Sequence, residues 1–282
     1  MSPVKTIKTF RDLLSFLTII PVGGKEDFIF TTAENVWLFP LLGGFIGLLG
    51  AAYFVGASLI VGFLLGLANS IVALPVGLLS ASIPAAMTIA FLSVVTGLQH
   101  FDGLIDLGNA VGLRNLHDRK MKAHAWTVTY WGAVLALVVE FTAFAGLFLV
   151  GWFTGNLWLV FASVLAAEVA AKLSMVTVVW IGKPSHKGLG SIFLAKAKKN
   201  LNAAAYVIAV AIAFPVFALL GNLLLGLVSV AVVLASVVVA VGMRAVSNKV
   251  FGGVSGDMIG ATNEVARAIA LVMFAVVLMV LA

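Results

Sequence analysis

Two carboxylates and one carboxamide stand at helical spacing directly after a long, almost uncharged stretch of the chain. They are Asp102, Asp106 and Asn109, within the segment QHFDGLIDLGNAVG at residues 99–112. Positions i, i+4 and i+7 lie within ~60° of one another around a helix, because each residue advances the helix by ~100°. We therefore expect the three side chains to share one face. Such a face suits Mg²⁺, which takes carboxylate and carbonyl oxygens and usually keeps waters and substrate phosphates as further ligands. A solvated helix end is the alternative interpretation.

A second polar segment, GGVSGDMIGATNE at residues 252–264, combines glycines with two acids. Its glycines are Gly252, Gly253, Gly256 and Gly260. They leave the backbone free to turn sharply and to approach a ligand, with amide groups available to phosphate oxygens. Asp257 and Glu264 share one side if a helix starts early in this segment. The alternative is a glycine-rich turn that leads into a polar helix start.

A third polar segment, GKPSHKGLG at residues 182–190, brings basic side chains and glycines together. Lys183, His186 and Lys187 could bind a phosphate or pyrophosphate, because a lysine ammonium acts as a point charge for such an anion. The segment follows an apolar run that contains Glu168 and Lys172. These two residues stand at i and i+4, and we expect them to neutralise each other inside a helical bundle.

The composition places these polar segments in a membrane protein. Hydrophobic residues make up 62% of the chain, charged residues only 10%, and the mean hydropathy is +1.18. Such values lie far outside those of soluble globular domains. Apolar stretches cover residues 35–60, 61–79, 83–98, 127–153, 156–181, 203–220, 221–241 and 266–282. Alternating strands are nearly absent, so the predicted fold is all-α, a polytopic integral membrane bundle of about seven or eight membrane segments.

The whole chain, residues 1–282, is predicted to form a single integral membrane domain. Residues 1–33 are expected to be a cytoplasmic or interfacial N-terminal segment, and residues 34–282 a helical bundle with polar loops near 99–125, 182–200 and 246–264. The N-terminal segment has an apolar side made of Phe10, Leu13, Leu14, Phe16 and Leu17. An interfacial helix would bury this side at the bilayer surface and leave Lys5, Lys8 and Arg11 near the headgroups. A tail packed on the bundle is the alternative.

The net charge of +6 does not indicate nucleic-acid binding, because the basic residues are confined to loops beside apolar stretches. One loop holds Arg114, Arg119, Lys120 and Lys122, a second holds Lys183, Lys187, Lys196, Lys198 and Lys199, and Arg244 and Lys249 flank a third. Short loops rich in lysine and arginine face the cytoplasm. We therefore expect a multi-pass protein of the cell membrane with its active-site loops on the cytoplasmic side. The absence of cysteine excludes disulfides and thiol catalysis.

Two features concern how the helices cross and pack. Three apolar segments precede Asp102, and an odd number of crossings would put the N-terminus and Asp102 on opposite sides of the membrane. Pro84 would break a helix, so we expect a re-entrant or half-length segment there. The small residues Gly43, Gly44, Gly47 and Gly50 predict close packing of helices, with no catalytic role.

Together these segments resemble the adenosylcobinamide-GDP ribazoletransferase family, also called cobalamin-5'-phosphate synthases. The acidic signature of that family, G-x-H-x-D-G-x-x-D-x-x-D-G, is matched by His100, Asp102, Gly103, Asp106 and, imperfectly, Asn109. Its late signature, G-G-x-(T/S)-G-D-x-x-G-A-x-x-E, is matched by Gly252, Gly253, Ser255, Gly256, Asp257, Gly260, Ala261 and Glu264. Residues 14–21, 39–43 and 188–190 also resemble the opening and the central loop of the family, so the resemblance spans nearly the whole chain.

The chain departs from the family pattern in three places. The third acidic position is Asn109, which can offer Mg²⁺ a carbonyl oxygen but supplies neither a charge nor a base. Ile19 stands where an arginine often follows the threonine, and residues 122–132 lack the acid that usually precedes the glycine turn. One candidate metal ligand or base of the family is therefore missing.

The resemblance implies transfer of the phospho-cobinamide group of adenosylcobinamide-GDP to α-ribazole or α-ribazole 5'-phosphate, with release of GMP. It implies Mg²⁺ as the cofactor, held on the pyrophosphate by Asp102, Asp106, Asn109 and Asp257. The implied catalytic residues are Asp102, Asp106, Asp257 and His100, the last as a base or as a group behind the ligands. The implied substrate- and cofactor-binding residues are Lys183, Lys187, Arg119, Gly256 and Glu264. The lipid bilayer is a further expected partner, and the chain could form a homo-oligomer.

Two other functions fit parts of the pattern. A CDP-alcohol phosphatidyltransferase also places spaced aspartates at a membrane face, but its longer signature does not continue after Gly112. An ion-coupled transporter could use Asp102, Asp106, Glu168 and Asp257 as an ion pathway. The acids cluster at loop edges and no internal symmetry is visible, which counts against a transporter.

Overall fold

The computed structural model describes residues 3–23, 28–123, 125, 127–197 and 199–281. Apart from an isolated bridge between Pro184 and Val254, the regular structure in these ranges is helical. In chain order the helices are α1 (Pro3–Leu17), α2 (Phe28–Glu34), the short 3-10 helix η1 (Val36–Leu38), α3 (Phe39–Asn69), α4 (Val76–Val95), α5 (Gln99–Val111), α6 (Leu116–Ala123), α7 (Tyr130–Thr154), α8 (Leu157–Ile181), α9 (Leu189–Lys196), α10 (Lys199–Leu220), α11 (Leu223–Phe251) and α12 (Gly256–Leu281).

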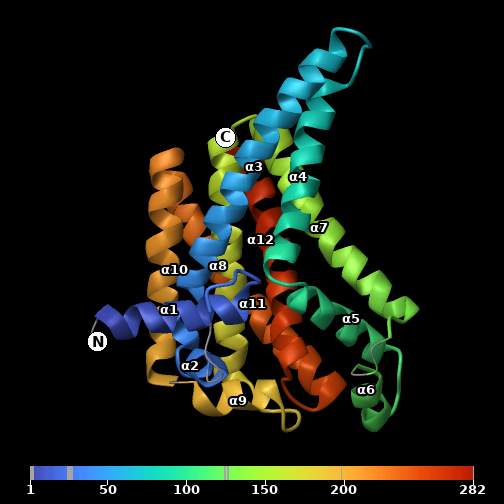
Figure 1. Ribbon diagram of the computed structural model, residues 1–282, viewed down its shortest axis with the longest axis vertical. Helices are drawn as coiled ribbons and strands as arrows, with labels where there is room; N and C mark the ends of the chain where they lie inside the picture. Colours follow the sequence, from blue (N-terminus) through green and yellow to red (C-terminus); the bar gives the residue numbers. More distant parts are fainter. Residues whose placement is uncertain (1–2, 24–27, 124, 126, 198, 282) are drawn as a thin grey trace.

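Seven of the helices are long enough and apolar enough to cross a membrane: α3, α4, α7, α8, α10, α11 and α12. They run along the long axis of the molecule, and the short helices α1, α2, α5, α6 and α9 gather around one end (Figure 1). We call this the loop-rich end. The expectation of an all-α polytopic membrane bundle is confirmed.

Two helices, α3 and α4, account for the three apolar segments that precede Asp102. Helix α3 continues through Asn69 and absorbs most of the second apolar stretch, and α4 then begins at Val76. The expected break at Pro84 was wrong, because this proline lies inside α4. A proline removes only one backbone hydrogen bond, and an apolar segment has no alternative to helix for satisfying the rest of its backbone in lipid. Two crossings therefore return the chain to the loop-rich end, where α1 and α5 both lie (Figure 1).

The basic segments also share this end. Helices α5 and α6, the 182–188 loop with α9, and the end of α11 all lie there (Figure 1). Positive charges are therefore collected on one side of the bundle, as the loop composition predicted. Lys198, part of the second basic loop, lies outside the described residues.

Helix α8 is the centre of the bundle, packed against α3, α10, α11 and α12. The predicted small-residue packing is confirmed where α3 crosses it. A Cβ added at Gly43 would lie 2.6 Å from the carbonyl oxygen of Glu168, and one at Gly47 would lie 2.8 Å from the Cα of Leu165. The two backbones can approach this closely only because these positions carry no side chain.

Helix α1 packs on the bundle through its predicted apolar side. Leu13, Leu14 and Leu17 are buried, and the ring of Phe16 lies 5.0 Å from that of Phe193 on α9. Of the two interpretations of the N-terminal segment, contact with protein is therefore the one observed. The side chain of Lys5 lies outside the described part of the chain.

Candidate active site

The turn between α4 and α5 sends the chain out of the bundle along the loop-rich end. Gly97 and Leu98 both have left-handed backbone conformations, with φ of 66° and 58°. Such a conformation is uncommon for a residue other than glycine, so the sharp change of direction at Leu98 is imposed by the surrounding fold. Helix α5 then starts at Gln99 and carries the first polar segment.

Helices α5 and α12 cross with almost no space between their backbones. A Cβ added at Gly103 would lie 2.3 Å from the carbonyl oxygen of Asp257, and one at Gly260 would lie 3.2 Å from the Cα of His100. The crossing brings the first acidic segment of the chain against the second. Helix α12 begins at Gly256, so the condition under which Asp257 and Glu264 belong to one helix is met.

The 182–188 loop is joined to the turn between α11 and α12. The amide of Val254 donates to the carbonyl of Lys183 over 2.7 Å, and the amide of Ser185 donates back to the carbonyl of Val254 over 3.1 Å. Gly253 must be glycine here, since an added Cβ would lie 2.7 Å from the carbonyl carbon of Pro184. The three polar segments identified in the sequence therefore meet at the loop-rich end.

Two cavities lie side by side at this meeting point, and Asp102 and Asp257 border both. The larger has a volume of about 400 Å³, and its polar lining residues are Gln99, His100, Asp102, His186 and Asp257. The smaller has a volume of about 320 Å³, and its acidic lining residues are Asp102, Asp106 and Asp257. The predicted convergence of these three aspartates on one site is thus what the fold produces.

The negative charges of Asp102, Asp106 and Asp257 repel one another. Partial burial, followed by the charges of Asp257 and Asp102, raises the pKa of Asp106 to about 7. Partial burial and then the charge of Asp257 also raise the pKa of Asp102. Like charges held this close favour either a bound proton or a bound cation, because each relieves their repulsion.

The chemistry of these donors fits Mg²⁺, although no complete coordination cage is formed. Within the described residues, no three His, Asp or Glu side chains are arranged to hold one metal ion. Mg²⁺ commonly uses only one or two carboxylates and takes its other ligands from water and substrate phosphates. Asp102 and Asp257 could supply those carboxylates at the rim shared by the two cavities, and Asp106 could supply another from the smaller cavity.

Asn109 has a different position from the one its spacing suggested. Its Oδ1 accepts hydrogen bonds from the amide and the hydroxyl of Thr129, over 2.9 and 2.7 Å, and its Nδ2 donates to the carbonyl of Thr127 over 2.8 Å. The side chain is only 3% exposed. Both lone pairs of the amide oxygen are already in use, so neither remains for a metal ion. Asn109 instead fixes the segment that lines the smaller cavity through Thr127 and Val128.

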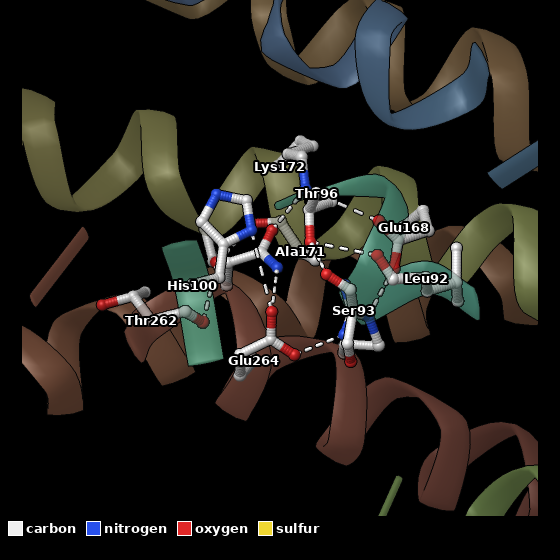
Figure 2. A network of polar contacts seen from close by, with 12 residues as sticks. Leu92, Ser93, Thr96, His100, Glu168, Ala171, Lys172, Thr262 and Glu264 are labelled. Atoms are coloured by element: carbon white, nitrogen blue, oxygen red, sulfur yellow. Dashed lines mark hydrogen bonds and ion pairs between the residues drawn. The ribbon is translucent and has the colours of Figure 1, made fainter. Parts of the chain in front are cut away.

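Glu264 lies beneath the larger cavity, inside a buried polar network. It is 2% exposed and pairs with Arg267 on the same helix. Asn263 links the network to α8, accepting from Lys172 over 2.7 Å and donating to Glu264 over 3.0 Å. Figure 2 shows Lys172, Glu168 and Glu264 converging from α8 and α12. Glu264, which the family resemblance had assigned to ligand binding, thus contacts protein groups here.

The expected pair of Glu168 and Lys172 is present, with 3.5 Å between Lys172 Nζ and Glu168 Oε2. The sequence did not reveal that Arg267 also pairs with Glu168. An arginine inside an apolar helix is itself a signal, since such a charge needs a partner within the bundle.

His100 lines the larger cavity beside Asp102. Its Nδ1 is 3.7 Å from Oε1 of Glu264, so one edge of the ring faces the buried network (Figure 2). Burial, followed by the positive charges of Lys172 and Arg267, holds the pKa of His100 well below its usual range. The imidazole is therefore neutral at physiological pH. His100 thus borders the larger cavity together with Asp102, whereas Asp106 borders the smaller one.

The predicted basic residues divide into two groups. Lys183 and Lys187 are exposed on the loop beside the site. Arg119 donates to the carbonyls of Leu113 and Lys249, over 2.7 and 2.9 Å, and so ties α6 to the end of α11.

The sequence placed Lys120 and His186 in two separate basic segments, and the structure brings them together with His117 between α6 and the 182–188 loop. His117, Lys120 and His186 line a third cavity of about 390 Å³ there. His186 also lines the larger cavity, so it borders both spaces. Lys120 donates to the carbonyl of Ser185 over 2.8 Å, which fixes the loop against α6.

Comparison with known proteins agrees with this arrangement. The family model for cobalamin-5-phosphate synthase matches residues 55–275. An adenosylcobinamide-GDP ribazoletransferase of Methanocella arvoryzae is 30% identical, over 93% of this chain and 92% of its own length. Proteins of the same name from Halorubrum lacusprofundi and Archaeoglobus fulgidus are 33% and 29% identical, over 94% and 91% of this chain and 95% and 92% of their own lengths. No solved structure matches. The chain, with its paired acidic segments on α5 and α12, belongs to the cobalamin-5-phosphate synthase family.

Proposed function

We propose that this protein transfers the phospho-cobinamide group of adenosylcobinamide-GDP to α-ribazole or α-ribazole 5'-phosphate and releases GMP. The observation that carries the proposal is the pair of adjoining cavities with Asp102 and Asp257 on their common rim. A transferase must hold a donor and an acceptor on opposite sides of the reacting phosphorus, and the two cavities offer that arrangement. The curated relatives bear this activity in their names.

The reaction forms one bond and breaks one. A ribose hydroxyl oxygen of the acceptor attacks the phosphorus attached to cobinamide, and the bond from that phosphorus to the oxygen of GMP breaks. The hydroxyl proton is lost, and GMP leaves with the bond's electron pair. When the acceptor already carries a 5'-phosphate, the attacking oxygen must be a different hydroxyl of the ribose. Positioning and charge stabilisation supply most of the rate in such reactions.

The residues of the candidate site have distinct roles in this reaction. Asp102, Asp106 and Asp257 would hold Mg²⁺, which would neutralise the pyrophosphate of the donor. His100 lies in the larger cavity as a neutral imidazole, which can take up the hydroxyl proton. The exposed Lys183 and Lys187 would contact the phosphates of the donor as it approaches. Asn109 and Arg119 are left out of the contact set because protein groups occupy their polar atoms.

The assay measures release of GMP by the purified protein in lipid nanodiscs, given adenosylcobinamide-GDP, α-ribazole and Mg²⁺. We expect GMP and a corrinoid product from the wild type, a loss of more than about 100-fold in Asp102→Ala, and no reaction when Mg²⁺ is removed by EDTA. Asp118→Ala changes an exposed acid on α6 and serves as the matched control. An inactive wild type, or an Asp102→Ala variant as active as the control, would contradict the proposal.

A further inference from the structure

The lining of the larger cavity includes three aromatic side chains besides its acidic residues. They are Phe16 of α1, Phe39 of α3 and Phe193 of α9, which we call the aromatic wall. The rings of Phe16 and Phe193 are 5.0 Å apart and tilted by 34°, and those of Phe39 and Phe193 are 6.2 Å apart. Phe39 and Phe193 are almost fully buried, so the wall is held rigidly. Phe16, which is half-buried, is therefore the ring with surface left for a ligand, and the buried Phe193 and Phe39 support it from behind.

The polar groups of the cavity are gathered on α5, α12 and the 182–188 loop. They are Gln99, His100, Asp102, His186 and Asp257. Met175, Leu189 and Ile259 complete the apolar lining. The lining thus combines apolar side chains, mainly from α1, α3, α8 and α9, with polar side chains from α5, α12 and the 182–188 loop that can bind hydroxyl and phosphate groups. A ligand that matches it has a flat apolar ring at one end and a polar, hydroxylated group at the other.

The volume restricts which substrate group can enter. Pockets for drug-sized ligands have volumes of about 300–1,000 Å³, and this cavity of about 400 Å³ lies near the lower limit. A nucleoside fits within that size, whereas a corrin ring with its amide side chains is several times larger. Of the substrates in the proposed reaction, only the acceptor nucleoside and the guanosine end of the donor are small enough.

The chemistry of the aromatic wall separates these two nucleosides. Guanine carries hydrogen-bonding groups along its edges, and burying them against apolar side chains without partners is costly. The alkylated benzimidazole of ribazole has an apolar edge and can stack on phenylalanine rings without that cost. We propose that the larger cavity is the acceptor subsite, and that Phe16, supported by the buried Phe193 and Phe39, recognises the benzimidazole base of ribazole. This assignment rests on the proposed function and names the substrate group that one of its two cavities takes.

The assignment also orients the reaction. With its base against the aromatic wall, the ribose of the acceptor lies toward His100, Asp102 and Asp257. The donor then approaches from the smaller cavity, where Asp106 joins the other two aspartates. Its corrin ring stays outside both cavities. The phosphorus to be transferred is thereby placed at the rim that the cavities share.

The test uses the full-length protein in nanodiscs and measures binding separately from turnover. Equilibrium dialysis with dimethylbenzimidazole, which has no ribose and cannot react, reports on the cavity alone. We expect Phe16→Ala to weaken its binding about tenfold and to raise KM for α-ribazole by a similar factor. KM for adenosylcobinamide-GDP should stay within about twofold of the wild-type value. Phe16→Leu keeps the apolar volume without the ring face, and we expect a smaller loss from it.

Phe10→Ala is the matched control. Phe10 lies on the same helix as Phe16 and is similarly half-buried, but its ring packs on Phe45 at 5.9 Å, outside the cavity. It should leave both KM values and base binding unchanged. Base binding that is insensitive to Phe16, or competition between GMP and dimethylbenzimidazole for one site, would overturn the assignment. A wild type that binds the base but releases no GMP would instead count against the proposed function.

Discussion

Asp102, Asp106 and Asp257 meet at the smaller cavity, and no cationic side chain is among the described residues that line it. Their mutual repulsion is a cost that the fold carries when no cation is bound. At Asp106, burial and then the charges of Asp257 and Asp102 raise the pKa to about 7. Catalytic sites commonly hold groups in such unfavourable arrangements, because the same field that destabilises the empty site binds the ligand. The charge of Asp106 therefore changes with pH near neutrality, and both cation binding at the site and the stability of the fold should change with it.

Asp106→Asn should stabilise the metal-free protein above neutral pH. The pKa of Asp106 in the folded protein is about 7, compared with an ordinary value of 3.8, so the folded state holds a proton that the unfolded state has already lost. Stability of the wild type should therefore fall as pH rises from about 4 to 7 and then level off. The substitution removes this penalty, so its stabilising effect should be largest at about pH 8 and vanish below about pH 4.

Thermal unfolding in EDTA at a series of pH values would measure the effect. Asp118→Asn, an exposed acid on α6, provides the control and should not alter the pH dependence. Addition of Mg²⁺ should narrow the difference between the wild type and Asp106→Asn, because a cation relieves the same repulsion. If Asp106→Asn changed the thermal stability equally at acidic and alkaline pH, the change would come from packing and not from the charge of Asp106.

At the scale of elements, the sequence identified the polar segments but not the contacts between them. Residue spacing correctly put Asp102 and Asp106 on one face, yet it could not show that the face of Asn109 meets the 127–129 segment. The glycines of the late segment suggested a flexible, ligand-binding backbone. In the structure Gly253 and Gly260 are instead places where another backbone packs closely. Periodicity defines the face of a helix, but the partner of that face is distant in sequence.

The same reasoning explains why Arg267 and the aromatic wall were missed. Their partners lie on other helices: Arg267 pairs with Glu168 of α8, and Phe16 of α1 packs on Phe193 of α9. Apolar patterns reveal that such residues are buried and leave open what they contact. The roles of Asp102, Asp106, Asp257 and His100 in catalysis stay predictions.

Gly103→Ala should separate the two acidic helices. Its Cβ would lie 2.3 Å from the carbonyl oxygen of Asp257, which is backbone and cannot rotate away, so α5 and α12 must move apart. A displacement of about 1 Å at a reacting centre can cost about 100-fold in rate, and we expect a loss of that order in kcat for GMP release. Gly62→Ala on α3 is the control, because no atom lies within 4 Å of its added Cβ. Full activity of Gly103→Ala would mean that catalysis does not need this close crossing.

At the scale of the whole molecule, the basic charge and the candidate site share one end of a seven-helix bundle. Hydropathy alone divided the chain before Asp102 into three apolar segments, because a gap in hydropathy need not coincide with the end of a helix. Helix α3 is 31 residues long and exceeds the ~20 residues that span the hydrocarbon core. The length of α3 cannot be read from composition. Once the bounds of α3 and α4 are known, the chain is seen to cross twice before Asp102.

We predict that the loop-rich end faces the cytoplasm, as the concentration of lysine and arginine there requires. The chain has no cysteine, so each introduced cysteine is a unique label site. Ala195 is exposed on α9 at the loop-rich end, and Val72 is 61% exposed in the turn between α3 and α4 at the other. A membrane-impermeant maleimide added to intact cells should label Val72→Cys at once and Ala195→Cys only after lysis. The reverse labelling pattern would place the candidate site outside the cell and contradict the predicted topology. It would also separate the site from a nucleotide-linked donor supplied in the cytoplasm.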